Sequence, residues 1–158
     1  LATALSLDIK TVSRYIDLLE KSFVLFKLQG FSSNLRKEVT KKHKYYFMDN
    51  GIRNAVISQF NEIEDRNDIG ALWENFIVIE RLKKQTYKEY YGAQYFLRSY
   101  DHKEIDLIEE SDGKCEAYEF KWNSEKPVAT QLHDYWMKNY GGSPITVIHR
   151  GNYLDFST

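Results

Sequence analysis

Two alternating stretches of polar and apolar residues flank Asp112-Gly113, a dipeptide that is the strongest short signal for a β-hairpin turn. With the turn at these two residues, Asp106 is expected opposite Glu119, and Glu104 opposite Lys121. All four would share one strand face, because side chains alternate along a strand. The other face would be apolar, formed by Ile105, Leu107, Tyr118, Phe120 and Trp122.

Carboxylates that face each other across a hairpin repel, since their Cβ atoms lie ~5 Å apart. A divalent cation, Mg²⁺ or Mn²⁺, held by Asp106 and Glu119 would offset that repulsion and activate a water for attack on a phosphodiester. Lys121 would orient the water or stabilise charge on the phosphorus. The alternative is a solvated hairpin face with a Glu104–Lys121 ion pair and no chemistry, because charged outward strand positions are common.

The acid at position 106, followed by Glu119-Phe120-Lys121, resembles the PD-(D/E)XK or restriction-endonuclease-like superfamily, with Ile105 where that family has proline. The resemblance implies that Asp106, Glu119 and Lys121 are catalytic and that the fold has an α-β-β-β-α-β core. The corresponding elements are expected as a helix near 69–85, strands near 94–99, 103–110 and 115–122, a helix near 128–139 and a strand near 145–149.

The same resemblance implies a further catalytic glutamate on the first helix, at Glu74. Glu104, which is expected on the same hairpin face as the other acids, is a candidate accessory acid. Gln131 and Tyr135 resemble the Q-x-x-x-Y element of RecB-like nucleases, which implies contact with nucleic acid, and residues four apart share a helix face. The alternative for Glu74 is an ordinary helix-surface acid. For the Gln131–Tyr135 pair it is a chance pattern, with Tyr135 in the core.

Basic residues concentrate in the first 48 positions, which contain nine basic and four acidic residues and so carry a net charge of +5. Because the whole chain carries −1, residues 49–158 carry a net charge of −6. Apolar spacing predicts a helix over 9–21 with Asp8 as its N-cap, after a helix end at 1–5. Strands at 23–28 and 44–48 would complete a winged helix-turn-helix. The alternative is an amphipathic helical hairpin that packs on a neighbouring domain. The residues expected to bind DNA are Lys10, Thr11, Arg14, Lys41 and Lys42.

The predicted organisation is therefore of the α/β (α+β) class, in two modules. A truncated winged helix over 1–48 leads through a connector over 49–68 into a restriction-endonuclease-like domain over 69–158. Lys44–Gly51 and Gly70–Asn75, with the acids and lysine above, resemble the C-terminal half of prokaryotic AAA-type P-loop ATPases. That resemblance implies an upstream ATPase module, and the start at Leu1, within a helical pattern, suggests a C-terminal fragment. ATP would bind only in that module, because these 158 residues contain no G-x-x-x-x-G-K-[ST] motif.

Composition narrows the functional classes. A net charge of −1 excludes a histone-like protein. The single Cys115 allows no internal disulfide and favours the cytoplasm. No apolar run reaches the ~18–20 residues of a membrane helix, so no membrane partner is expected, and an oligomer is left open. The leading hypothesis is a Mg²⁺- or Mn²⁺-dependent nuclease that acts on DNA. The alternative is a catalytically inactive interaction or regulatory module of the ATPase, which the acidity of residues 49–158 favours.

Overall fold

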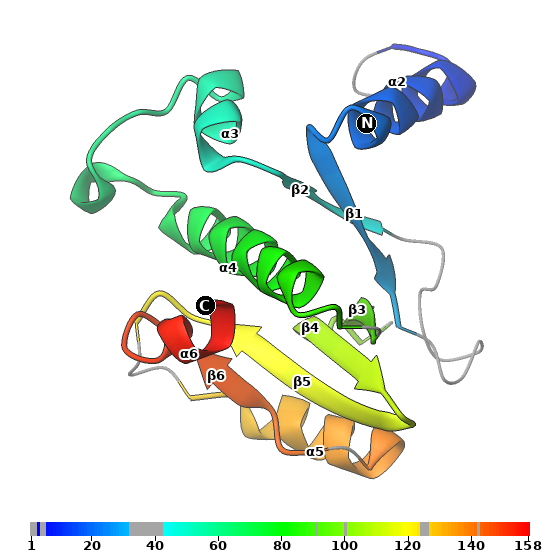
Figure 1. Ribbon diagram of the computed structural model, residues 1–158, viewed down its shortest axis with the longest axis vertical. Coiled ribbons are helices and arrows are strands. Elements are labelled where there is room, and N and C mark those ends of the chain that lie inside the picture. Colours follow the sequence, from blue (N-terminus) through cyan, green and yellow to red (C-terminus); the bar gives the residue numbers. More distant parts are fainter. Residues whose placement is uncertain are drawn as a thin grey trace.

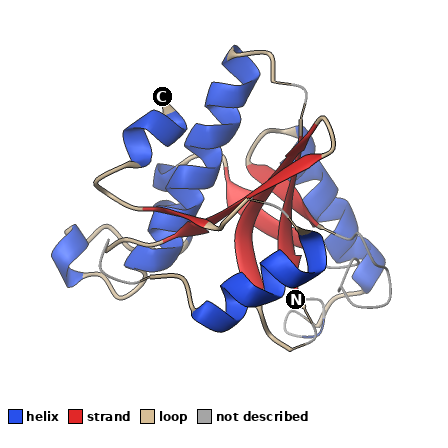
Figure 2. Ribbon diagram, turned by 90° about the horizontal axis from the view of Figure 1, so that it is seen from below, coloured by secondary structure: helices blue, strands red, loops and turns tan. Residues whose placement is uncertain are grey.

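One six-stranded mixed sheet forms the centre of the molecule, with strand order β2-β1-β3-β4-β5-β6. The computed structural model describes residues 3, 6–31, 43–90, 92–99, 101–123, 127–141 and 143–158. Helices α4 and α6 cover one face of the sheet and α5 covers the other (Figures 1 and 2), so the predicted α/β class is confirmed. The elements are α2 (Ile9–Lys21), β1 (Leu25–Gly30), β2 (His43–Phe47), α3 (Asn50–Val56), a 3₁₀ turn (Ile63–Asp65), α4 (Ile69–Tyr87), β3 (Ala93–Arg98), β4 (Glu104–Ser111), β5 (Lys114–Phe120), α5 (Thr130–Tyr140), β6 (Thr146–Ile148) and α6 (Tyr153–Ser157).

Two apolar clusters form the core, one on each face of the sheet. On the first face, Trp73 and Ile77 of α4 pack with Leu107 of β4 and with Phe156 of α6. On the second face, Trp136 of α5 is fully buried in a cluster that also includes residues of β3, β4 and β5. Because both faces of the sheet are covered, few positions are left for charged side chains in its middle, and those that occur there need partners.

Helix α2 begins and ends where the sequence predicts, and the Asp8 carboxylate accepts hydrogen bonds from the amides of Lys10 and Thr11 at 3.1 and 3.3 Å. The predicted apolar stripe, however, is not a buried one. Val12 is the single buried residue of α2, whereas Ile9 and Leu19 are exposed. The reason is that α2 lies against β1 at one side only, without a second helix over it among the described residues (Figure 1).

Strands β1 and β2 pair antiparallel, as expected of the two wing strands. Strand β1 also pairs in parallel with β3, through Gln29↔Tyr95 and Gly30↔Phe96. The expectation of a separate wing is therefore corrected, because these two strands are one edge of the main sheet. Lys41 and Lys42, which were expected to bind DNA, lie outside the described residues, as does most of the expected helix end at 1–5.

The β4–β5 hairpin has the predicted turn, and its register is the predicted one from the turn to the Leu107–Tyr118 pair, where the ladder ends before the expected Asp106–Glu119 pair. Asp112 and Gly113 both have positive φ, 52° and 73°, as a two-residue turn of type I′ requires, and Leu107 pairs with Tyr118.

The prediction of one polar and one apolar hairpin face is wrong, because both faces are covered: Ile108 and Ala117 pack in the cluster beside α5. In addition, β4 contains a β-bulge. Tyr95 pairs with Ile108 but Leu97 pairs with Ile105, so two residues of β4, Asp106 and Leu107, oppose Phe96 alone. The extra residue changes the alternation. Ile105 therefore packs in the cluster beside α5, and Leu107 packs in the cluster beside α4.

Among the described residues, no helix is both long enough and apolar enough to cross a bilayer.

Candidate functional site

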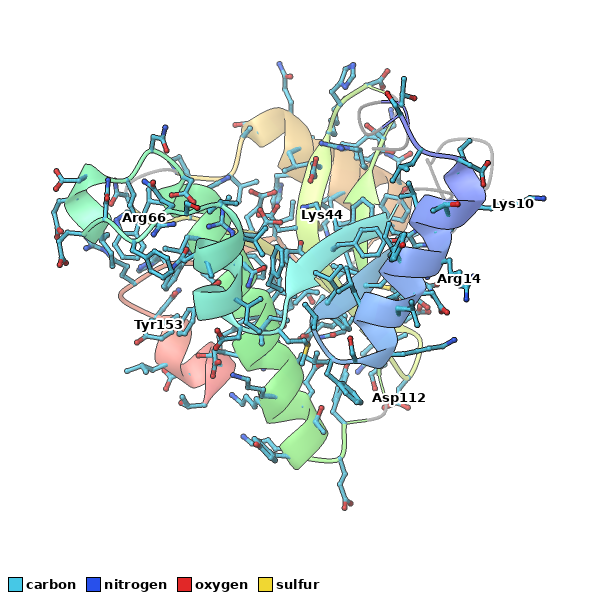
Figure 3. All side chains as sticks on the ribbon, turned by 90° about the horizontal axis from the view of Figure 1, so that it is seen from above. Lys10, Arg14, Lys44, Arg66, Asp112 and Tyr153 are labelled. Carbon is cyan, nitrogen blue, oxygen red and sulfur yellow. The ribbon has the colours of Figure 1, made fainter. Side chains whose placement is uncertain are left out.

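A lysine from the edge strand lies among three carboxylates that come from two other elements. The Nζ atom of Lys44 is 2.8 Å from Glu74 Oε1, 2.6 Å from Glu104 Oε1 and 3.4 Å from Asp106 Oδ1. Glu74 belongs to α4, whereas Glu104 and Asp106 belong to β4. We call Lys44 and these three acids the Lys44 cluster. Figure 3 shows Lys44 in the middle of the molecule, among side chains of several elements.

Hydrogen bonds from α4 fix the strand that carries Lys44. The Asn75 side chain, 5% exposed, accepts from the Phe47 amide at 2.8 Å and donates to the Phe47 carbonyl at 2.8 Å. The Asn75 side-chain Nδ2 also donates to Asn50 Oδ1 at 2.9 Å. One position earlier on α4, Glu74 accepts a hydrogen bond of 2.7 Å from the Tyr46 hydroxyl. Because Lys44 and Tyr46 are two residues apart on one strand, both side chains reach the same face.

Asp106 lies where β4 and β5 separate. The backbone pairing of the two strands ends at Leu107 and Tyr118. After it, the Phe120 amide donates a hydrogen bond of 2.9 Å to the Oδ2 atom of the Asp106 side chain. Glu119, which is buried, forms an ion pair of 2.8 Å with the half-exposed ammonium of Lys121. The bulge in β4 and the side chain–backbone bond thus hold the Asp106 carboxylate near the end of β5.

Electrostatics in this region are dominated by carboxylates in excess. Burial, followed by the charges of Glu74 and Glu119, raises the pKa of Asp106 to about 7. Burial alone would lower the pKa of Lys44, but the attraction of Glu74 and Asp106 outweighs it and the pKa lies above its ordinary value. Lys121 shows the same balance, because its bond to Glu119 raises its pKa against the effect of burial. Both lysines therefore stay charged at neutral pH.

Two open cavities flank the acids. The first, of about 320 Å³, is lined by Lys44, Glu74 and Glu104 together with Arg53, Asn75 and other residues. The second, of about 470 Å³, is lined by Glu104, Asp106, Glu119, Lys121 and His102, and on its far side by residues 127–129 and Leu132. Asp106 and Glu119 thus line the same cavity. Among the described residues, no group of three or more His, Cys, Asp and Glu side chains is arranged to hold a metal ion.

The structure brings together most of the residues predicted for the catalytic site. Asp106, Glu119 and Lys121 line one cavity, and Glu74 joins Asp106 through the Lys44 cluster. The predicted Glu104–Lys121 pair is wrong. Glu104 instead pairs with Lys44 and with Arg98 Nη2 at 2.6 Å, because the neighbouring strand β3 places Arg98 directly beside it.

The residues predicted to bind nucleic acid are not part of this cluster. Lys10, Thr11 and Arg14 are exposed on α2, and Figure 3 shows Lys10 and Arg14 at the periphery, directed away from Lys44. On α5, Gln131 is exposed, while Tyr135 contacts Tyr140 and lies beneath the Lys103 ammonium at 5.1 Å. Neither is among the described residues that line the Asp106 cavity.

Sequence reasoning missed Lys44, Tyr46 and Arg98 as members of the site. Lys44 stands 30 positions before Glu74 and 62 before Asp106, and periodicity does not reveal contacts over such separations. One signal was available, since Lys44 and Tyr46 alternate in the same segment that carries the resemblance to the ATPase family.

A sheet enclosed by helices, with acids and lysines of several strands and of α4 gathered at one end, defines an α/β protein with a buried polar centre. Residues 69–153 match the family described as Domain of unknown function (DUF4143). Since that match covers more than half of the chain, the protein belongs to this family. Residues 1–63 match a second family, Domain of unknown function (DUF8612), and the two matches meet within the predicted connector.

Three relatives are uncharacterised proteins. One of Mycobacterium tuberculosis and one of Mycobacterium bovis are each 27% identical over 134 residues, which cover 84% of this chain and 30% of the relative. One of Haemophilus influenzae is 31% identical over 98 residues, which cover 62% of this chain and 22% of that protein. The chain thus spans less than a third of the length of these relatives. No solved structure matches.

Proposed function

We propose that this chain is the nuclease-like part of a longer ATPase-family protein, and that it hydrolyses DNA phosphodiesters with one divalent cation at Asp106 and Glu119. The observation that carries the proposal is that both carboxylates and the Lys121 ammonium line one open cavity. The resemblance to the PD-(D/E)XK pattern rests on these same residues.

The donor set suits a hard divalent cation. Mg²⁺ takes carboxylate oxygens, keeps several waters and commonly uses only one or two protein carboxylates together with substrate phosphate. Asp106 and Glu119 supply two such groups beside a cavity of about 470 Å³, which has room for water and a phosphate. Burial, and after it the charges of Glu74 and Glu119, raise the pKa of Asp106, and a bound cation would offset both effects. When bound, the cation supplies an acidified water and offsets charge on the phosphate.

The protein's own groups have separable tasks in this scheme. The Phe120 amide fixes the orientation of the Asp106 carboxylate. Lys121 stays charged beside Glu119 and is exposed enough to contact a phosphate oxygen or to orient the attacking water. Lys10 and Arg14, on the outer face of α2, would contact the DNA backbone away from the reacting phosphate.

Cleavage of plasmid and single-stranded DNA in Mg²⁺ or Mn²⁺ tests the proposal. Asp106→Asn and Glu119→Gln keep the side-chain volume and remove the charge, and each should lower the rate at least 100-fold. Asp134→Asn, an exposed acid on α5, is the matched control and should cleave like wild type. Equal cleavage by wild type and Asp106→Asn would exclude this cavity as the source of activity.

A second candidate is a non-catalytic interaction or regulatory module. The observation that favours it is that each acid already has a cationic or amide partner, since Lys44, Arg98, Lys121 and the Phe120 amide serve the four carboxylates. Calorimetric titration with Mn²⁺ separates the two candidates. No heat of binding and no change in melting temperature at millimolar Mn²⁺ would favour this second function.

The wider part of the proposal concerns the longer protein. The relatives are more than three times as long as the matched region, and the family resemblance implies that an upstream module binds ATP and controls this part in the cytoplasm. ATP hydrolysis by the full-length protein, but not by residues 1–158, is the expected result. Hydrolysis by this chain alone would contradict it.

A further inference from the structure

Lys44 occupies the place that a cation would take between three of the four acids. Its Nζ contacts Glu74, Glu104 and Asp106 within 3.4 Å, and its side chain is 19% exposed. An ammonium group has three donor hydrogens, which matches three carboxylate acceptors. A cation of the protein itself therefore already occupies this position and offsets part of the negative charge of the three acids.

The lysine is held in this place by its strand, unlike a surface lysine that happens to reach an acid. Lys44 pairs with Leu28 of β1, and its ammonium lies 5.6 Å from the centre of the Phe96 ring. The Tyr46 hydroxyl fixes the same Glu74 oxygen that Lys44 contacts. Asn75 then fixes the backbone of β2 beyond it.

The two lysines lie at different cavities. Lys44 lines the smaller cavity with Glu74 and Glu104. Lys121 lines the larger cavity with Asp106 and Glu119, where it pairs with Glu119, and Glu104 lines both cavities. Many phosphodiester-cleaving sites hold two metal ions about 4 Å apart, one for each side of the scissile phosphate. Here a lysine fills one side.

We infer that Lys44 is a built-in cation that takes the place of a second metal ion, so that the site binds a single divalent cation on the Asp106–Glu119 side. This inference rests on the proposed function. It also makes the N-terminal segment part of the site, because the strand that supplies the cation precedes the DUF4143 match. A fixed monovalent cation offers no exchangeable water, so Lys44 can stabilise phosphate charge but cannot generate a nucleophile.

Counting bound Mn²⁺ tests the inference without an activity assay. Wild type should bind one Mn²⁺ per chain, measured by calorimetry and by electron paramagnetic resonance. Lys44→Met removes the ammonium but keeps the length of the side chain, and it should raise the count to two. Glu104→Gln in the Lys44→Met background should return the count to one. Lys44→Arg keeps the positive charge and is the matched control, with one ion expected.

The possible failures are distinguishable. Two ions in wild type, or one ion in folded Lys44→Met, would overturn the inference and leave the proposed metal site intact. No ion in wild type would overturn the proposed function and the inference with it. If Lys44→Met does not fold, as judged by circular dichroism, Lys44→Gln and the wild-type count decide the question.

Discussion

Asn75→Ala should loosen the strand that carries Lys44. The side chain is buried and makes three hydrogen bonds of 2.8–2.9 Å, two to the Phe47 backbone and one to Asn50. A neutral hydrogen bond contributes about 1 kcal/mol net, and each buried group left without a partner costs about 1–3 kcal/mol. Phe47 is only half-buried, so water can reach part of the freed backbone. The expected loss in the free energy of unfolding is therefore about 2–4 kcal/mol.

Urea denaturation followed by circular dichroism measures this loss. Asn75→Asp is the sharper variant, because it keeps an acceptor for the Phe47 amide, loses both donated bonds and adds a charge beside Glu74. It should lose at least as much stability as Asn75→Ala. Asn139→Ala removes one hydrogen bond on an exposed face of α5 and is the control, with a change within about 0.5 kcal/mol.

Hydrogen exchange at the Phe47 amide gives a local measure of the same effect. In Asn75→Ala this amide should exchange faster than in wild type by more than the change in global stability explains. If the free energy of unfolding fell by less than 1 kcal/mol in Asn75→Ala, or by as much in Asn139→Ala, the conclusion that Asn75 attaches β2 to α4 would be refuted.

Three further predictions concern other parts of the structure. Arg81 binds the carboxylate of Glu109, which is 1% exposed, at 2.7 and 2.8 Å, so Arg81→Met leaves that carboxylate without its cation. We expect the free energy of unfolding, measured by urea denaturation, to fall by about 3–5 kcal/mol. A loss under 1 kcal/mol would contradict this. Because the pKa of Asp106 is raised in the folded state to about 7, the folded protein retains a proton that the unfolded chain releases, so stability in metal-free buffer should fall as the pH rises from about 4 to about 7. Asp106→Asn should remove that part of the slope, and an unchanged pH profile would show that Asp106 is not its source. Gly113→Ala should lower the free energy of unfolding by about 1 kcal/mol, because φ is +73° at this position, which strains any residue with a Cβ even though the Cβ has free space. Thermal melts measure this loss, and an unchanged melting temperature would show that there is no such strain.

Local patterns in the sequence were sufficient for most of the elements. Apolar periodicity located α2 and α4, and Asp112-Gly113 set the hairpin register through Leu107 and Tyr118. These features depend on neighbouring residues, which is why a single sequence reveals them. Asp106 and Glu119 were predicted to share a site for the same reason, since the register follows from the turn.

The remaining features depend on tertiary contacts. The alternation of polar and apolar residues over 104–109 is broken only by the adjacent Leu107 and Ile108, a pattern that does not by itself locate the bulge that opposes Phe96 with both Asp106 and Leu107. The pairing of β1 with β3 joins residues more than 60 positions apart, and it turned an expected wing into an edge of the sheet. Lys44 was missed for the same reason.

The hydrogen bonds of Asn75 also determine what can happen at the outer edge of the sheet. Since the Met48 amide bonds to the Val24 carbonyl on the inner side, the amide and carbonyl of Phe47 point outward. Those are the groups through which a foreign strand would add to the sheet, and Asn75 already occupies both. At this position, self-association by strand addition would first have to displace a helix side chain.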